Sequence, residues 1–96
     1  YRKVYMSKST TTIFKEVRKA GTAPSLEEAQ KFVGGWVETV SFPDGSLLII
    51  NEEGKLENLP LNPLATALWH KHYGPTDQIV GNAIHIAADA RGEGWS

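Results

Sequence analysis

The stretch "SFPDGSLLIIN", residues 41–51, constrains the fold more than any other part of the chain. Its "PDG" combines a residue of fixed φ, a turn former and a glycine that accepts positive φ, which predicts a type I turn with a bulge between two strands. In the second strand the apolar side chains of residues 47–50 alternate between both faces. Such a strand is either covered on both sides or covers a partner chain.

The stretch "PSLEEAQKFVGG" predicts a short helix over residues 25–34. Ser25 suits the N-cap, and Glu28 three residues later completes a capping box. Leu26, Ala29, Phe32 and Val33 then form an apolar stripe at helical spacing. Gly34 can adopt the left-handed conformation that ends the helix.

A second helix is predicted between residues 62 and 74. Asn62 suits its N-cap and Pro63 its first helical position. Leu64, Ala67, Leu68 and Trp69 form its expected buried stripe. The pair Gly74–Pro75 ends it, because proline cannot continue the helical ladder.

Residues 2–6 and 10–17 predict a hairpin, residues 36–42 the strand before the "PDG" turn, and residues 77–88 a last strand. We therefore expect an α+β fold in the order β-β-α-β-β-α-β. Its small mixed or antiparallel sheet has about five strands, with two short helices. Residues 1–88 form one domain, and residues 89–96 are expected to be a C-terminal tail in which Trp95 has no core to join.

Composition narrows the function classes. A chain of 96 residues has room for one core. A net charge of −1 argues against binding to the nucleic-acid backbone, which calls for a basic surplus. No apolar run is long enough to cross a membrane, and the absence of cysteine fits a reducing compartment, so we expect a cytoplasmic protein. The small net charge and the doubly apolar strand also predict a homo-oligomer, with a dimer as the expected form.

The residue patterns do not support an enzyme. His70 and His72 are two apart on a helix and point in different directions, while His85 stands alone on a strand, so we expect no metal site. Glu52 and Glu53 are neighbours in a turn and diverge, which does not suit an acid–base pair. We therefore expect no catalytic residues, no metal and no cofactor.

The stretches "FVGGWVETV", "PDGSLLIINEEGKLENLPLN" and "DQIVGNAIHI", in this order, resemble a family of small phage- and plasmid-encoded proteins of unknown function. The resemblance covers about residues 25–88. Its specific parts are Gly34–Gly35 with Glu38, residues 51–55 ("NEEGK"), Leu59–Pro60 with Asn62, and Gly81. The resemblance implies a protein that acts by binding in the host bacterial cytoplasm.

Four asparagines are candidate ligand-binding residues, each with a structural alternative. Asn62 is mostly explained as an N-cap. Asn51 ends an apolar strand and can instead satisfy the following turn. Asn58 has no evident local role. Asn82 interrupts an apolar face, so it either bonds a neighbouring loop or is presented to a ligand.

Four other residues complete the expected binding set. Trp36 or Trp69 can stack a ring, although core packing is the alternative for both, and Lys55 or Arg18 can meet a phosphate. Together with the family resemblance, these residues lead us to expect a protein that sequesters a small nucleotide-derived immune signal. The alternative is an inhibitor directed at a host defence or restriction enzyme, with the acid-rich stretch 51–58, Tyr73 and Trp95 at its interface.

Overall fold

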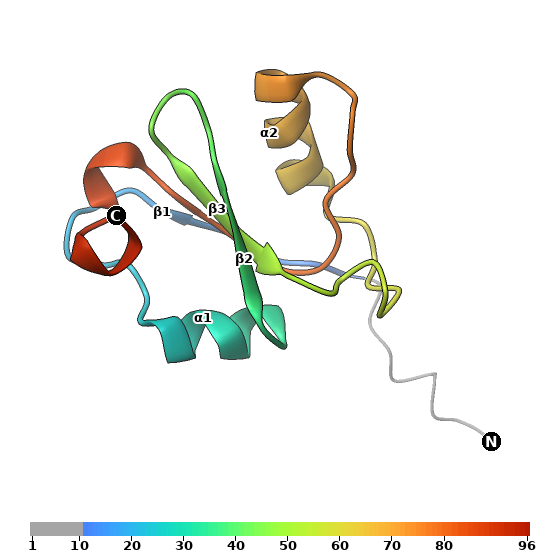
Figure 1. Ribbon diagram of the computed structural model, residues 1–96, viewed down its shortest axis with the longest axis horizontal. Helices are drawn as coiled ribbons and strands as arrows, with labels where there is room; N and C mark the ends of the chain where they lie inside the picture. Colours follow the sequence, from blue (N-terminus) through green and yellow to red (C-terminus); the bar gives the residue numbers. More distant parts are fainter. Residues whose placement is uncertain (1–10) are drawn as a thin grey trace.

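The computed structural model describes residues 11–96, which fold as a four-stranded sheet between two helices (Figure 1). The elements in chain order are β1 (Phe14–Val17), α1 (Leu26–Val33), β2 (Val37–Ser41), β3 (Leu47–Asn51), α2 (Pro63–Tyr73), β4 (Ala83–Ile86), and the short 3₁₀ helices η2 (Ala88–Ala90) and η3 (Glu93–Trp95). The two α-helices lie on opposite sides of the sheet, which confirms the expected α+β class with two helices.

The sheet is mixed, with strand order β1-β4-β3-β2. β2 and β3 form the predicted hairpin and pair antiparallel from Val37 opposite Asn51 to Ser41 opposite Leu47. β4 pairs antiparallel with β3 and parallel with β1. The described part of the sheet therefore has β1 at one edge and β2 at the other.

The described sheet has four strands rather than about five. The expected strand 2–6 lies outside the described residues. The last strand was expected over 77–88 but spans only Ala83–Ile86. Gly81 has φ of 81°, and this conformation interrupts the extended chain, so Val80 makes only an isolated bridge to Leu61.

The predicted ends of both helices are confirmed. The Ser25 side chain accepts a hydrogen bond from the Glu28 amide, and Glu28 accepts one from the Ser25 amide, completing the capping box. Gly34 closes α1 in the left-handed conformation. Asn62 caps α2 ahead of Pro63, and the helix ends at Tyr73 before Gly74.

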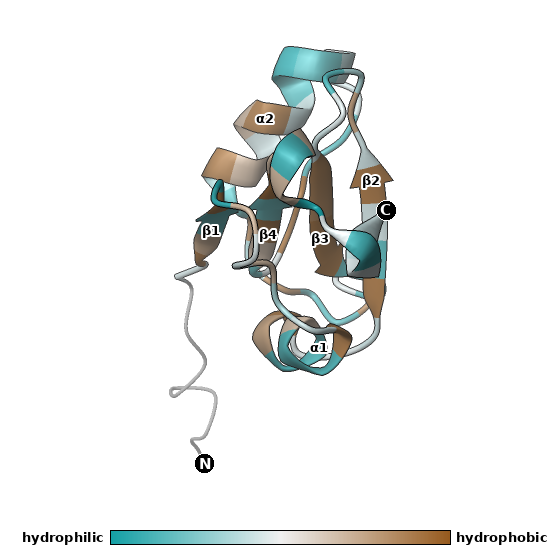
Figure 2. Ribbon diagram, turned by 90° about the vertical axis from the view of Figure 1, so that its left-hand side faces the viewer, coloured by the Kyte–Doolittle hydropathy of each residue, from teal (hydrophilic) through white to brown (hydrophobic). Residues whose placement is uncertain are grey.

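β3 is covered on both faces within one chain. Leu47 and Ile49 pack in the core cluster on the α1 side, and Leu48 packs in the cluster on the α2 side. In Figure 2, β3 is coloured hydrophobic along most of its length and lies between the two helices. Of the two alternatives for this strand, the structure shows coverage on both sides within one chain, so β3 needs no partner chain to cover it. The dimer stays a prediction.

Three expectations about the core were wrong. Leu26 and Leu64 are 53% and 63% exposed, because each helix turns other residues inward: Ala29 and Val33 are the buried residues of α1, and Ala65 and Thr66 those of α2. Trp95, expected to find no core, packs against the α1-side cluster, and its indole N–H donates to the Pro24 carbonyl at 2.8 Å. Ala90 is buried in the same cluster, so residues 89–96 contribute to the core. Within residues 11–96 no helix has the length and apolarity needed to cross a membrane.

Candidate functional site

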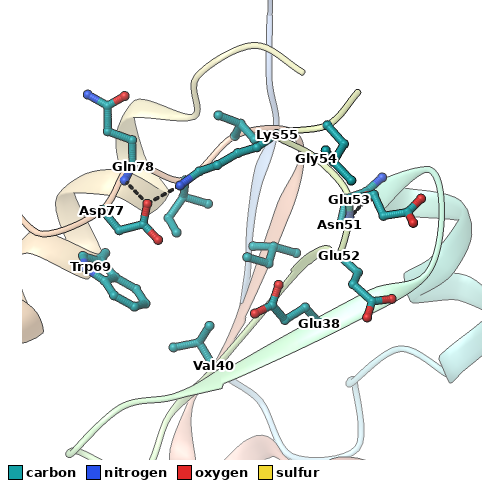
Figure 3. A pocket seen from close by; sticks show the side chains of 14 residues that line it. Glu38, Val40, Asn51, Glu52, Glu53, Gly54, Lys55, Trp69, Asp77 and Gln78 are labelled. Atoms are coloured by element: carbon teal, nitrogen blue, oxygen red, sulfur yellow. Dashed lines mark hydrogen bonds and ion pairs between the residues drawn. The ribbon is translucent and has the colours of Figure 1, made fainter. Parts of the chain in front are cut away.

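A cleft of about 200 Å³ opens on the α2 side of the sheet, next to the β2 edge (Figure 3). Strands β2 and β3, helix α2 and two loops contribute its walls. The loops are residues 52–58, which we call the acidic loop, and residues 75–80, which lead into β4. The lining residues are Glu38, Val40, Ile50, Asn51, Glu52, Glu53, Gly54, Lys55, Leu56, Trp69, Asp77, Gln78, Ile79 and Val80.

Strand alternation supplies the floor of the cleft. Glu38 and Val40 lie two apart on β2, and so share the face on which Val40 joins the α2-side cluster. Ile50 lies opposite Glu38 on β3 and joins the same cluster. The floor is therefore apolar except for one carboxylate. The Glu38 side chain makes no hydrogen bond or ion pair with another described residue.

The acidic loop is a compact helical turn. The Glu57 amide donates to the Glu53 carbonyl at 3.0 Å, and the Leu59 amide donates to the Gly54 carbonyl at the same distance. Asn58 closes the turn with φ of 55°. Gly54 is required here, since a Cβ on it would lie 2.9 Å from a methyl group of Val80. This close approach holds the acidic loop against the loop that precedes β4.

An ion pair between Lys55 and Asp77 spans the cleft. In Figure 3 the Lys55 side chain extends from the acidic loop across to Asp77, beside Trp69 and Gln78. The backbone N–H of Gln78 donates to the same Asp77 oxygen at 2.8 Å. The hydrogen bond from Lys55 holds the pKa of the Asp77 carboxyl below its ordinary value, and the Gln78 amide acts in the same direction.

The cleft is richer in acids than in bases. Four carboxylates line it, and Lys55 is the one cation in the lining. The indole of Trp69 forms one wall, and its N–H donates to the Thr76 hydroxyl at 2.9 Å. An aromatic face beside a carboxylate can hold a flat ring whose edge carries N–H donors, or a cation. The surplus of acids disfavours a ligand with many negative charges.

Three of the eight expected binding residues line the cleft: Asn51, Lys55 and Trp69. Asn51 is 4% exposed, and both ends of its amide are occupied. The amide nitrogen donates to the Val33 carbonyl and the oxygen accepts from the Glu53 amide. Asn51 therefore shapes the turn, which is the structural alternative for this residue, and Lys55 and Trp69 carry the polar and aromatic contacts.

Asn62 and Asn82 are occupied within the fold. Asn62 is 1% exposed, caps α2, and donates to the carbonyls of Ile13 and Gly81. Asn82 accepts from the Ile13 amide and donates to the Phe32 carbonyl. Each links segments distant in the sequence, and neither lines the cleft.

Asn58, Trp36 and Arg18 also lie outside the cleft lining. Asn58 has the local role that its sequence did not reveal, as the left-handed residue of the acidic loop. Trp36 was expected to pack or stack, but it is 69% exposed beside Gln30 and Gly35. Arg18 follows β1 at the end of the sheet where Leu47 and Ile86 lie, opposite the Asn51 end, and pairs with Glu16.

Glu38, Asp77 and Gln78 are polar lining residues that were not among the expected binding residues. Glu38 had a usable signal, because a carboxylate that shares a strand face with Val40 interrupts an apolar surface. Asp77 had none, because its contact with Lys55 joins positions 22 apart in the chain.

The histidines do not gather into a metal site among residues 11–96, where no group of three or more histidine or acidic side chains could hold an ion. His70 lies 3.0 Å from the Asp77 carbonyl, and His85 lies 2.9 Å from a Glu16 carboxylate oxygen. His72 stacks on Phe42 with ring centroids 4.5 Å apart. His72 and His85 therefore both pack against Phe42, whereas His70 lies beside Asp77.

Fold and site together define a small α+β protein with a helix on each face of a mixed sheet and an acid-lined cleft at one edge. The chain matches the family profile "Domain of unknown function (DUF3846)" over residues 3–96, and it belongs to that family. The expected membership of a family of unknown function is thereby confirmed, over a longer range than the expected 25–88. Searches of curated proteins and of solved structures found no match to the chain.

Proposed function

We propose that this protein is a non-catalytic binding protein that captures a small nucleotide-derived ligand in the cleft between α2 and the acidic loop. The observation that carries the proposal is the grouping of Trp69, Glu38 and Lys55 around one space. An indole can stack a base, a carboxylate can accept from its N–H edge, and an ammonium can meet a phosphate.

The size of the cleft limits what it holds. Its volume of about 200 Å³ falls below the roughly 300–1,000 Å³ of most small-molecule sites. One base fits this space better than a whole dinucleotide, whose remainder would extend over the surface or into a second copy of the chain. The dimer expected from the sequence would supply such a second surface, and it belongs to this proposal.

The biological setting also belongs to the proposal. A phage- or plasmid-encoded protein that holds an immune signal lowers its free concentration without chemistry, provided that capture is tight and roughly stoichiometric. A bacterial cytoplasm would be the place of action. The resemblance to phage and plasmid proteins motivates this role.

The test compares two tryptophans. Calorimetry with cyclic dinucleotides, cyclic trinucleotides and ADP-ribose derivatives is expected to find a ligand for the unaltered protein, and mass spectrometry of the bound fraction to recover it intact. Trp69→Leu should weaken binding at least about tenfold, the scale of a lost stacking contact. Trp36→Leu removes an exposed indole outside the cleft lining and is the matched control. Absence of heat with every ligand, or an equal loss in both variants, would contradict the proposal.

A second candidate function is inhibition of a host protein, and Leu56 favours it. This side chain is 82% exposed on the acidic loop, next to Glu57 and close to Glu52 and Glu53. An apolar residue framed by acids suits a partner surface that is basic around an apolar pocket. Trp95 leaves this interface because it packs in the core. A pull-down that enriches one host protein with the unaltered chain, but not with Leu56→Asp, would support this candidate.

A further inference from the structure

A second, more open cleft of about 580 Å³ adjoins the first on the other side of the Lys55–Asp77 pair. It is lined by Lys55, His70, Pro75, Thr76, Asp77, Gln78 and Val80. Lys55, Asp77, Gln78 and Val80 line both clefts. The ion pair therefore lies at the boundary between the two clefts.

This boundary is easily opened. The side chains of Lys55 and Asp77 are 61% and 38% exposed, and an ion pair this exposed contributes little net stability. Among the described residues, the Lys55–Asp77 contact is the one side-chain bond between the acidic loop and residues 75–78. The backbone links nearby lie beyond these loops, between Pro60 and Gly81 and between Asn62 and Ile79.

Each partner has another contact available when the Lys55–Asp77 ion pair opens. Asp77 keeps the hydrogen bond from the Gln78 amide when Lys55 leaves. Lys55 keeps its position at the boundary, where its ammonium reaches both clefts. An anion placed there can take over the hydrogen bond that Asp77 now receives, so the exchange trades one charge-assisted bond for another.

We propose that Lys55 exchanges Asp77 for a single anionic group of the ligand, so that the site selects a base joined to one phosphodiester over both the neutral nucleoside and a polyphosphate. The inference rests on the proposed function and specifies its ligand class. One ammonium can compensate one negative charge, whereas Glu38, Glu52, Glu53 and Asp77 repel any further charge. The ring lies against Trp69 in the first cleft, and the phosphodiester lies at the boundary.

The test uses ligands that share a nucleoside and carry increasing negative charge: the nucleoside, the 3′,5′-cyclic monophosphate and the 5′-triphosphate of adenosine and of guanosine. For the unaltered protein, calorimetry should rank the cyclic monophosphate first for the preferred base. Lys55→Gln should weaken the cyclic monophosphate about tenfold, the scale of one charge-assisted hydrogen bond, and leave the nucleoside unchanged.

Asp77→Asn is the decisive variant, because it removes the competitor for Lys55 while keeping an oxygen for the Gln78 amide. It should tighten the cyclic monophosphate about fivefold through relief of this competition. Glu57→Gln is the matched control, since it removes one acid of the acidic loop that lies outside the cleft lining, and it should change affinity less than about twofold.

The outcomes separate the two proposals. If a nucleoside binds and its cyclic monophosphate binds no better, or if Asp77→Asn gains no more than Glu57→Gln, the exchange is overturned while the proposed function stands. If no nucleoside, cyclic monophosphate or triphosphate binds the unaltered protein or Asp77→Asn, the exchange is overturned. The proposed function is overturned with it only if the cyclic dinucleotides, cyclic trinucleotides and ADP-ribose derivatives also give no heat.

Discussion

The two faces of the sheet are built differently. On the α1 face, the buried apolar cluster extends from Val17 on β1 to Ala90 after β4, and buried Asn51 ends β3 on the face that it shares with Ile49. On the α2 face, the apolar cluster is smaller, and polar side chains lie among the packed residues. The cleft lies on this second face. The comparison indicates that the larger apolar cluster closes the α1 face and that the α2 face is left partly open.

Side-chain hydrogen bonds position both helices. At α1, the Asn51 and Asn82 side chains donate to the carbonyls of Val33 and Phe32 at the end of the helix, whereas hydroxyl groups hold α2. The Thr66 hydroxyl both donates to the Ile79 carbonyl and accepts from the Ile79 amide. The Tyr73 hydroxyl donates to the Ser41 carbonyl at the end of β2. These bonds hold α2 by its ends and flank, so that it need not cover Glu38 and Val40 closely. An open edge of the sheet is the result.

Truncation of neighbouring residues on β3 tests the comparison with the largest expected effect. Ile49 is fully buried on the α1 face, and Ile49→Ala should lower the free energy of unfolding by about 2–5 kcal/mol. Ile50 lines the cleft and is only partly buried, so Ile50→Ala should cost about 1 kcal/mol. Chemical denaturation measures both. Equal losses would mean that the two faces are packed alike.

Removal of the helix caps should have an intermediate effect on the free energy of unfolding. Asn62 is buried and bonds two carbonyls besides capping α2, so Asn62→Ala should cost about 2–4 kcal/mol. Ser25 is an exposed cap of α1, and Ser25→Ala should cost about 1 kcal/mol. Thermal unfolding of both variants compares their losses of stability. A Ser25 variant as unstable as the Asn62 variant would contradict the polar anchoring of α2.

The smallest effect concerns the pKa of Asp77. Because Lys55 lowers this pKa, Lys55→Gln should raise it toward the ordinary value of 3.8, as followed by NMR titration. Because the pKa of Asp77 is lower in the folded state than in the unfolded state, its carboxylate stabilises the folded state at a pH above the unfolded-state pKa. This stabilisation is lost as the pH falls through the folded-state pKa. The variant should therefore lose well under about 1 kcal/mol above pH 4, and the difference should vanish in stronger acid.

Asp44 is the internal control for this titration. Hydrogen bonds from the Ser46 side chain and amide lower its pKa, and neither involves Lys55. Its titration should be the same in Lys55→Gln and in the unaltered protein. If the Asp44 and Asp77 titrations moved together, the substitution would be acting through the whole fold rather than through the ion pair.

The predictable parts of the fold are those written locally in the sequence. Ser25 with Glu28, the "PDG" turn and Asn62 with Pro63 each carry their signal within a few residues, and all are confirmed. Pairings across the chain had no such signal. The contacts of Lys55 with Asp77 and of Trp95 with Pro24 join segments whose separate patterns do not refer to each other.

The same distinction explains the candidate site. Lys55 and Trp69 were expected because of their chemistry, and the structure brings them to one cleft. The asparagines were chosen for the same reason, yet Asn62 and Asn82 serve backbone groups that only the folded topology brings near them. A side-chain amide looks alike in both roles until its partners are known.

The parallel pairing of β1 with β4 has a consequence for biosynthesis. β1 is synthesised first among the described strands, but its partner follows much later, with Glu16 and His85 separated by 69 positions. The α1 helix and the β2–β3 hairpin leave the ribosome in the interval and can assemble without β1. An unpaired strand invites association with other nascent chains. Lys15, Glu16 and Arg18 place charges along β1 and just after it, and charges on an unpaired strand disfavour such association.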